Sequence, residues 1–228
     1  MRATIRGKIL ESARSFFFTK GYNKTSIQNI IDDVEIAKGT FYHHFKSKEQ
    51  LLDEISDIIV DQKVAKIQRD LENSTDDAFA KFNTFVNQQT DWKLEQLDLL
   101  YVVLTAMYSE HNILFQQKIK EKNIVRYLPI LTDIIKQGIS EGIFDTDVPE
   151  LMAELILRLS IFWGDGIAEI FLRSSNYQDP VRLIVERYNL LLQAIERLLD
   201  AKKSLLGLVD RSVIEEIIKY IREREEEG

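Results

Sequence analysis

Apolar residues recur at helical spacing along almost the whole chain. The first apolar stripe predicts a helix over residues 3–20, with Gly21 in the left-handed conformation that often ends a helix. A second stripe predicts a helix over about residues 27–34, capped by a side-chain oxygen of Thr25 or Ser26. The beginning of the chain therefore predicts two helices joined by a short connection.

A very short helix follows over Lys38–His44, and Ser47 begins a longer helix that we expect to extend to about Leu71. Ser47 and Gln50 have the spacing of a capping box, in which each side chain bonds the backbone N–H of the other residue. A helix, a tight turn at residues 35–37 and a short helix have the spacing of a helix-turn-helix, whose second helix enters the major groove of DNA. The short helix is therefore the candidate reading helix.

The helical period continues to the end of the chain and is interrupted by several stops. These lie at residues 73–75, about Asp91, 111–112, 142–149, 174–180 and 207–210. Pro129 lies inside a periodic stretch, and we expect a kink or a break near Leu128 because proline removes a helical hydrogen bond. The pattern gives about nine or ten helices and no convincing strand, so we predict an all-α fold.

Composition narrows the class of protein. The chain has 228 residues, enough for one or two domains, and its 45% of hydrophobic residues against 29% of charged ones excludes wholesale disorder. The lack of cysteine excludes disulfides, thiolate catalysis and thiolate zinc sites. No apolar run reaches the ~18 residues of a membrane span, and the N-terminus lacks a signal-peptide core. We therefore expect a cytoplasmic protein with no membrane partner.

Charge is distributed unevenly along the chain. Residues 1–50 contain nine Lys and Arg against five Asp and Glu, whereas the remaining 178 residues contain 21 against 32. A basic N-terminal module on an acidic body indicates that only the first fifty residues face a polyanion such as DNA.

The short helix carries residue types that suit DNA. Lys38 lies at the helix start, where free backbone N–H groups already favour an anion, and it can pair with a phosphate. Gly39 lets the backbone approach DNA closely, and Thr40 can contact a base edge or a thymine methyl group. Tyr42 and His43 present polar tips on the exposed face. The two neighbouring histidines face different sides of the helix, so we expect no metal site there.

The run KGTFYHHFKSKEQLL at residues 38–52 resembles the signature of the tetracycline-repressor (TetR/AcrR) family of transcriptional regulators. The resemblance extends over about residues 5–55. It implies phosphate contacts at the start of the second helix, along the reading helix and at the start of the fourth helix, together with base contacts from the reading helix. The residues that it implicates in DNA binding are Thr25 or Ser26, Lys38, Gly39, Thr40, Tyr42, His43 and Lys48.

Two positions depart from the family pattern. The family usually has glycine in the turn and serine before the lysine, where this chain has Glu35 and Ala37. Without the serine the short helix loses a capping oxygen, worth ~1 kcal/mol, and one phosphate contact. Glu35 places a negative charge near DNA and strains the turn if the turn requires a positive φ.

The resemblance also implies a two-domain organisation. Residues 1–47 would form a three-helix DNA-binding domain with the helix-turn-helix, and residues 48–228 a larger helical bundle for effector binding and dimerisation. Two long apolar helices within residues 150–203 would form most of the dimer interface. We expect one more amphipathic helix over residues 210–226, packed on the body or on the other subunit.

A ligand pocket in this family lies among the middle helices of each subunit. The candidates here are large apolar side chains and two acidic residues that can meet a cationic ligand. They are Trp92, Tyr101, Met107, Tyr108, Phe115, Tyr127, Phe162, Trp163, Asp165 and Glu169. Core packing is the alternative role for every apolar member of this set, and the acidic pair can equally lie in the interface or in water.

These observations predict a homodimeric transcriptional repressor that binds a palindromic operator on double-stranded DNA and is released by a small molecule. We expect no cofactor. The sequence contains no glycine-rich phosphate loop, no metal-ligand spacing and no nucleophile beside a base, so we expect no enzymatic activity. A ligand-independent architectural or division-linked DNA-binding protein of the same fold is the alternative.

Overall fold

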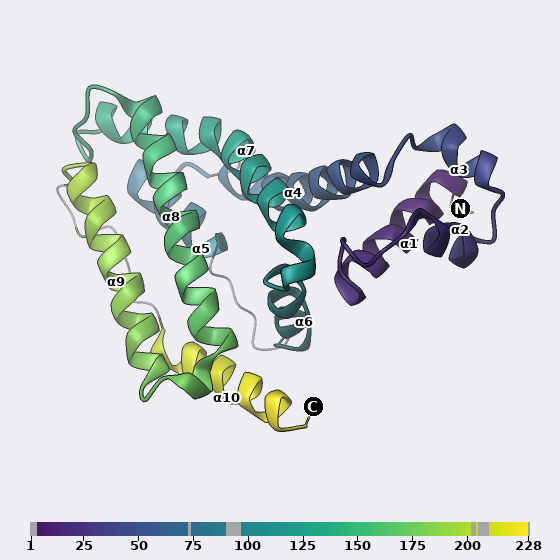
Figure 1. Ribbon diagram of the computed structural model, residues 1–228. Coiled ribbons are helices and arrows are strands. Elements are labelled where there is room, and N and C mark those ends of the chain that lie inside the picture. Colours follow the sequence, from purple (N-terminus) through teal and green to yellow (C-terminus); the bar gives the residue numbers. More distant parts are fainter. Residues whose placement is uncertain (1–3, 73, 90–96, 202–203, 205–209, 228) are drawn as a thin grey trace. The chain divides into compact units, whose positions relative to one another are not determined.

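The structure is a computed structural model that describes residues 4–72, 74–89, 97–201, 204 and 210–227. Among these residues it contains ten α-helices, two 3₁₀ helices and no strand, which confirms the predicted all-α class (Figure 1). The α-helices are α1 (Ile5–Thr19), α2 (Ile27–Val34), α3 (Lys38–His44), α4 (Lys48–Glu72), α5 (Ala78–Gln89), α6 (Leu97–Met107), α7 (Ile113–Ser140), α8 (Pro149–Leu172), α9 (Pro180–Leu198) and α10 (Arg211–Glu227). The 3₁₀ helices are η2 (Glu110–Asn112) and η3 (Ser174–Asn176). In the described part of the chain, no helix is both long enough and apolar enough to cross a membrane.

The chain divides into two compact units. Unit 1 comprises residues 1–62 and 102–123, and unit 2 comprises residues 63–101 and 124–228. Unit 1 therefore extends beyond residue 47, since the first part of α4 and the start of α7 group with the three N-terminal helices. Phe115 of α7 accounts for this grouping, since it is fully buried and its ring lies 6.1 Å from that of Phe17 of α1. Proximity in sequence alone does not reveal such a packing partner.

The core of unit 1 holds the short helix α3 in place. A seven-residue helix is not stable by itself in water, so it needs tertiary packing. Phe41 and Phe45 supply that packing, since both side chains are fully buried. The other buried members of the same cluster come from α1, α2, α4, α7 and the loop after α1: Ile9, Ala13, Phe17, Tyr22, Ile30, Ile31, Leu51, Leu52, Ile55 and Phe115.

In unit 2, the long helices α8 and α9 run side by side, and α10 packs on both of them (Figure 1). The buried stripe of α10 consists of Ile214, Ile217, Ile218 and Ile221, which confirms the predicted amphipathic pattern of this helix. Arg222 adds a polar tie, since its guanidinium donates a 2.9 Å hydrogen bond to the carbonyl of Ser174 in η3.

Near Leu128 the sequence predicted a kink or a break, and helix α7 continues through Pro129, so the break is wrong. Proline lacks the N–H group that would bond the carbonyl of Val125, four residues earlier. Val125 is 62% exposed, which allows water to satisfy that carbonyl. A single missing hydrogen bond on a solvated face does not end a helix of 28 residues.

Candidate nucleic-acid interface

Ser26 is the residue that caps α2. Its hydroxyl accepts a 3.1 Å hydrogen bond from the N–H of Asn29, and the Asn29 side-chain oxygen accepts a 2.9 Å bond from the N–H of Ser26. Thr25 is buried, and its hydroxyl donates to the carbonyl of Gly21 at 2.8 Å. Ser26 is exposed, so of the two candidates at this helix start only Ser26 is open to a phosphate.

The turn between α2 and α3 contains the strain that the sequence indicated. Glu35 adopts the left-handed conformation, with φ 57° and ψ 48°. This conformation favours glycine because a Cβ atom crowds the following carbonyl oxygen. Ala37 occupies the N-cap position of α3 and provides no side-chain hydrogen bond. The start of α3 therefore lacks a side-chain cap, and its N-terminal turn is closed by the N–H of Thr40, which bonds the carbonyl of Ala37 at 2.9 Å.

Helix α3 separates its polar and apolar residues. Lys38, Gly39, Tyr42 and His43 are exposed, and Thr40 is half-buried. A Cβ atom built at Gly39 meets no other atom within 4 Å, so the packing of the chain does not require glycine at this position. The helix therefore presents a lysine, an open stretch of backbone and two polar ring side chains on the side opposite its buried phenylalanines.

Lys48 differs from the other predicted DNA contacts. Its ammonium group donates hydrogen bonds of 2.8 Å to the carbonyls of Tyr22 and Thr25, and lies 4.2 Å from the centroid of the Tyr22 ring. Burial lowers the pKa of this ammonium group. The side chain is directed towards the loop that connects α1 and α2, which the sequence did not indicate.

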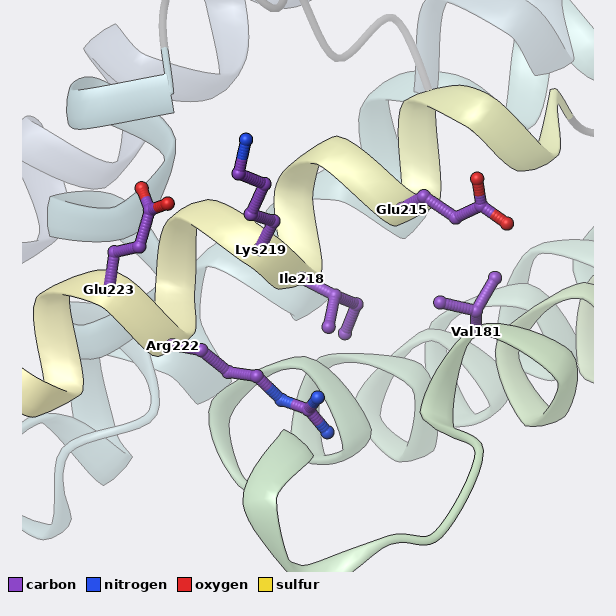
Figure 2. A pocket seen from close by; sticks show the side chains of 6 residues that line it. All are labelled: Val181, Glu215, Ile218, Lys219, Arg222 and Glu223. Atoms are coloured by element: carbon purple, nitrogen blue, oxygen red, sulfur yellow. The ribbon is translucent and has the colours of Figure 1, made fainter.

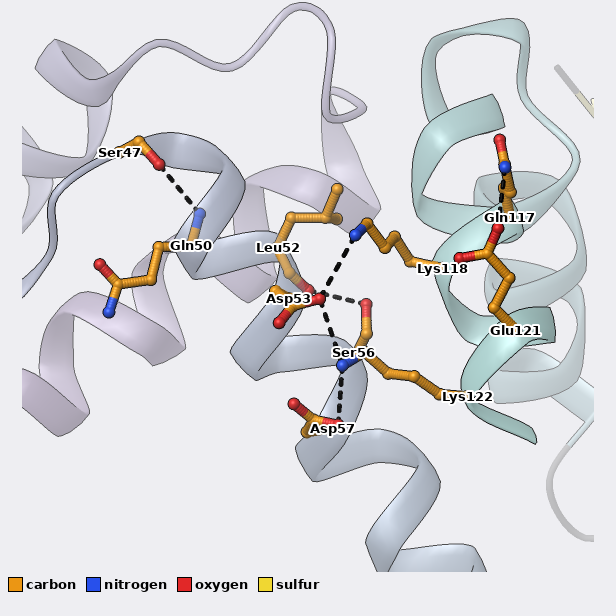
Figure 3. Close-up of polar contacts among 10 residues, drawn as sticks. All are labelled: Ser47, Gln50, Leu52, Asp53, Ser56, Asp57, Gln117, Lys118, Glu121 and Lys122. Carbon is orange, nitrogen blue, oxygen red and sulfur yellow. Dashed lines mark hydrogen bonds and ion pairs between the residues drawn. The ribbon is translucent and has the colours of Figure 1, made fainter. Parts of the chain in front are cut away.

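Further charges link α4 to the start of α7 within unit 1 (Figure 3). The ammonium of Lys122 lies 3.2 Å from Asp53 and 2.8 Å from Asp57, and that of Lys118 lies 3.5 Å from Asp53. Burial alone would raise the pKa of Asp53, but the hydrogen bonds and charges of the two lysines outweigh it and hold that pKa below its ordinary value. We call these four residues the ion cluster. No local pattern in the sequence indicates the ion cluster, because its partners are more than sixty residues apart.

The structure distributes the predicted ligand residues over different surroundings. Trp92 lies outside the described residues. Phe115 belongs to the core of unit 1, and Phe162 is 73% exposed on α8. Tyr127 is buried in unit 2, where its ring lies 5.7 Å from that of Phe85. Phe115 and Phe162 therefore have the positions of a core residue and a surface residue, respectively.

The remaining predicted ligand residues are mostly half-buried. The ring of Tyr101 lies 6.4 Å from that of Tyr220 on α10, and Glu169 is exposed beside Arg173, 3.3 Å away. Trp163 donates a hydrogen bond to α9. The others, all half-buried, are Met107, Tyr108 and Asp165.

A depression of about 350 Å³ lies between the start of α9 and helix α10 (Figure 2). Its lining residues are Val181, Glu215, Ile218, Lys219, Arg222 and Glu223. None of the predicted ligand residues lines it. Ile218 and Val181 supply its apolar surface, and two acidic and two basic side chains of α10 balance around them, so no net charge is concentrated there.

Two protein-family models match the chain. The model described as bacterial regulatory proteins of the tetR family matches residues 9–55, and the model described as the tetracyclin repressor-like C-terminal domain matches residues 103–175. The HTH-type transcriptional repressor KstR2 of Mycobacterium tuberculosis is 27% identical over 167 residues, which cover 67% of this chain and 74% of KstR2. Both halves of the chain therefore have relatives among repressors.

Solved structures show the same fold. The fatty acid degradation regulator FadR from Bacillus halodurans matches with a TM-score of 0.57 at 21% identity, over 84% of this chain and 96% of that chain. The transcriptional regulator FadR from Bacillus subtilis, solved in complex with stearoyl-CoA, matches with a TM-score of 0.56 at 22% identity, over 81% and 96%. The two family models, the repressor relative and the helix-turn-helix of α2 and α3 agree: the chain belongs to the TetR family of DNA-binding transcriptional regulators.

Proposed function

We propose that this TetR-family regulator is a homodimeric repressor that binds a palindromic operator and is released from it by a small molecule. Each protomer would insert α3 into a major groove. Two-fold symmetry would then place the half-sites about one helical turn, ~34 Å, apart.

Gly39 is the observation that supports the contact of α3 with DNA. Glycine inside a helix is less favourable than alanine by about 1 kcal/mol, and no neighbour in the described part of the chain fills the space of its missing side chain. An open backbone at this position suits an external surface that approaches closely. Lys38 and Thr40 flank Gly39, and we assign them contacts to the DNA backbone or to base edges.

Phosphate contacts would hold this helix in its register on the duplex. Ser26 lies exposed at the N-terminus of α2, where backbone N–H groups and the helix dipole favour an anion. Tyr42 and His43 are exposed near the C-terminal end of α3. Contacts of this kind add affinity without sequence preference, whereas the contacts of α3 to bases supply the specificity.

An exposed apolar face on α8 and α9 supports dimerisation. Leu151, Leu155 and Phe162 of α8 are 65%, 47% and 73% exposed, and spacings of four and seven residues place them on one side of the helix. Leu190 of α9, the helix beside it, is 52% exposed. Exposed large apolar side chains gathered on one side of a helix are typical of an interaction surface, and a second copy of the chain can cover them symmetrically.

The stearoyl-CoA complex of the FadR relative suggests which effectors to test first. That protein shares the fold of this chain at 22% identity. We therefore propose an acyl-CoA thioester as the effector, bound in unit 2. A ligand that binds better to the conformer with low DNA affinity shifts the population towards that conformer and releases the operator.

Two titrations test this function. The first measures binding of stearoyl-CoA and of a short-chain acyl-CoA to the protein by calorimetry, with free coenzyme A as the control. The second adds the same compounds to the protein bound to its selected operator and follows the release of fluorescent DNA. Release by an acyl-CoA and not by coenzyme A supports the proposal. Acyl-CoA that binds without any change in operator affinity contradicts the proposed release.

A further inference from the structure

The loop of residues 21–25, which we call the clasp loop, connects α1 to α2 and has its main chain bonded from two sides. On one side, Lys48 of α4 binds the carbonyls of Tyr22 and Thr25. On the other side, the N–H of Tyr22 donates to Asn112 at 2.7 Å, and the N–H of Asn23 donates to the carbonyl of His111 at 3.0 Å. All of these residues belong to unit 1.

Lys48 has little capacity left for a phosphate. An ammonium group has three N–H donors, and two of them already bond carbonyls of the clasp loop at 2.8 Å. The same ammonium lies 4.2 Å from the centroid of the Tyr22 ring, where the π-electrons attract it. A phosphate that took this cation would remove a donor from the carbonyls of two buried residues, Tyr22 and Thr25, although the carbonyl of Tyr22 would keep the N–H of Thr25 at 3.2 Å.

Asn112 uses its whole amide group on its neighbours. The residue is buried, with 1% of its surface exposed, and its Oδ1 accepts from the N–H of Tyr22. Its Nδ2 donates to the carbonyl of Phe17 at 2.8 Å and to that of Ala106 at 2.9 Å. Asn112 therefore joins the end of α1, the clasp loop and the end of α6.

Gly21 lies so close to His111 that a side chain at this position of the clasp loop would not fit. Gly21 has φ 86°, and a Cβ atom there would lie 2.5 Å from the Cβ of His111. The loop leads directly into Ser26, the N-cap of α2. Its position therefore sets where α2 begins, and α2 in turn carries the turn to the reading helix.

We propose that Lys48 and Asn112 are positioning residues that hold the clasp loop, and with it the start of α2, in the arrangement that binds DNA. Lys48 acts through its bonds to Tyr22 and Thr25 and contacts no phosphate. This role replaces the phosphate contact that the family resemblance implied for Lys48. The inference rests on the DNA binding proposed above, but it concerns residues that do not touch DNA.

The salt dependence of DNA binding separates the two roles of a lysine. Let K be the association constant for DNA. Removal of a residue that binds one phosphate reduces the magnitude of the slope of log K against log salt by about 0.9. Removal of a positioning residue instead lowers K by the same factor at every salt concentration. We would measure binding to a fluorescent duplex of random sequence between about 50 and about 200 mM salt. The variants are Lys48→Met, Asn112→Ala and Lys38→Ala, with Ser56→Ala as the control.

We expect Lys48→Met and Asn112→Ala to weaken binding by a constant factor, roughly 2- to 30-fold, with the wild-type slope. Lys38→Ala should instead lower the slope. Ser56 is buried, and its hydroxyl bonds the carbonyl of Leu52 in its own helix, at 2.7 Å. Its variant loses stability without touching the clasp loop, and its DNA affinity should equal that of the wild type well below the melting temperature.

A slope that falls for Lys48→Met as it does for Lys38→Ala would overturn the positioning role, and so would an unchanged affinity. If Asn112→Ala does not fold, as judged by circular dichroism, Lys48→Met decides the matter, because methionine keeps the apolar stem. No binding by the wild-type protein itself would instead contradict the proposed DNA contact of α3.

Discussion

The indole N–H of Trp163 donates a 2.7 Å hydrogen bond to the backbone carbonyl of Arg187, and the Arg187 guanidinium lies 5.8 Å from the centroid of the indole ring. The contact joins α8 to α9 at mid-length. Gly166 leaves room for the guanidinium, because a Cβ atom there would lie 2.7 Å from a side-chain nitrogen of Arg187. This hydrogen bond therefore joins the two helices at the residue next to Phe162, whose own side chain is exposed.

Phe162→Glu should convert the protein into a monomer. Phe162 is 73% exposed, and aromatic residues at the centre of an interface contribute most of the binding energy. We expect a weakening of self-association by at least about 100-fold, or about 2.7 kcal/mol, since a carboxylate would be buried on both sides of the two-fold axis. Sedimentation velocity over a range of concentrations measures this change.

Val125→Glu is the matched control for this variant. Val125 is 62% exposed and belongs to α7, outside the apolar face that we assign to α8 and α9. The same substitution there should leave the association unchanged. A dimer that persists in Phe162→Glu, or one that dissociates equally in both variants, would show that the exposed face of α8 is not the interface.

Gly39→Ala should stabilise the protein and weaken DNA binding. The added methyl group meets nothing within 4 Å, so the better helix propensity of alanine should add about 1 kcal/mol to the free energy of unfolding. The same methyl group would separate α3 from the major groove, and we expect operator affinity to fall about tenfold, or about 1.4 kcal/mol. Urea unfolding and DNA titration of one preparation measure both effects.

Gly164→Ala provides the comparison for Gly39→Ala. Gly164 is also helical with no neighbour within 4 Å of a built Cβ, but it lies on α8. Its variant should be stabilised without a direct effect on DNA contacts. If Gly39→Ala binds DNA as tightly as the wild type, the backbone of α3 does not approach the groove closely.

Glu35→Gly should stabilise the protein by about 1 kcal/mol, because glycine adopts the left-handed conformation of this turn without a steric penalty. Glu35→Ala removes the charge but keeps the Cβ atom, so it should give no such gain. Thermal unfolding of the two variants separates strain from charge. Equal stability of the glycine and alanine variants would mean that the turn is not strained.

Asp53→Asn should reduce the sensitivity of the fold to acid. The lysines of the ion cluster hold the pKa of Asp53 below its ordinary value of about 3.9. A depressed pKa stabilises the folded state above the unfolded-state pKa, and that stability is lost as the pH falls through the folded-state pKa. The unfolding free energies of wild type and variant should therefore differ at about pH 6 and converge towards about pH 3.

The size of this effect should be modest, because the Asp53 side chain is 47% exposed and surface ion pairs contribute at most about 1 kcal/mol. Glu121→Gln is the control, since Glu121 accepts a hydrogen bond from Gln117 on the surface of α7 (Figure 3). Parallel curves for wild type and Asp53→Asn across this pH range would show that the ion cluster does not contribute to stability.

Short-range signals made the reading helix predictable from the sequence. The bounds of Lys38–His44 agree with the structure because Phe41 and Phe45 mark its buried side and Ser47 marks the next helix start. The choice between Thr25 and Ser26 was not accessible in the same way. Both have a side-chain oxygen at a suitable distance, and only the burial of Thr25 decides between them.

Contacts between distant parts of the chain account for what the sequence did not reveal. Asn112 bonds Tyr22 across 90 positions, and Phe115 packs against Phe17 across almost a hundred, so neither residue stands out in a periodic pattern. The sequence leaves Phe115 open between a ligand role and core packing, and its burial places it in the core of unit 1. At Pro129 the local rule predicted a kink or a break, and the helix continues because one missing hydrogen bond beside the exposed Val125 does not end it.

Selection of binding sites from random duplex DNA at about 0.15 M salt tests the central claim most directly. The wild-type protein should enrich one palindrome whose half-sites lie about one turn apart, and the double variant Lys38→Ala, Tyr42→Ala should enrich nothing. Enrichment of the same sequence by the double variant would contradict the assignment of α3 as the reading helix. Enrichment of a site without two-fold symmetry, or of no site by the wild type, would contradict a homodimer that recognises a palindromic operator.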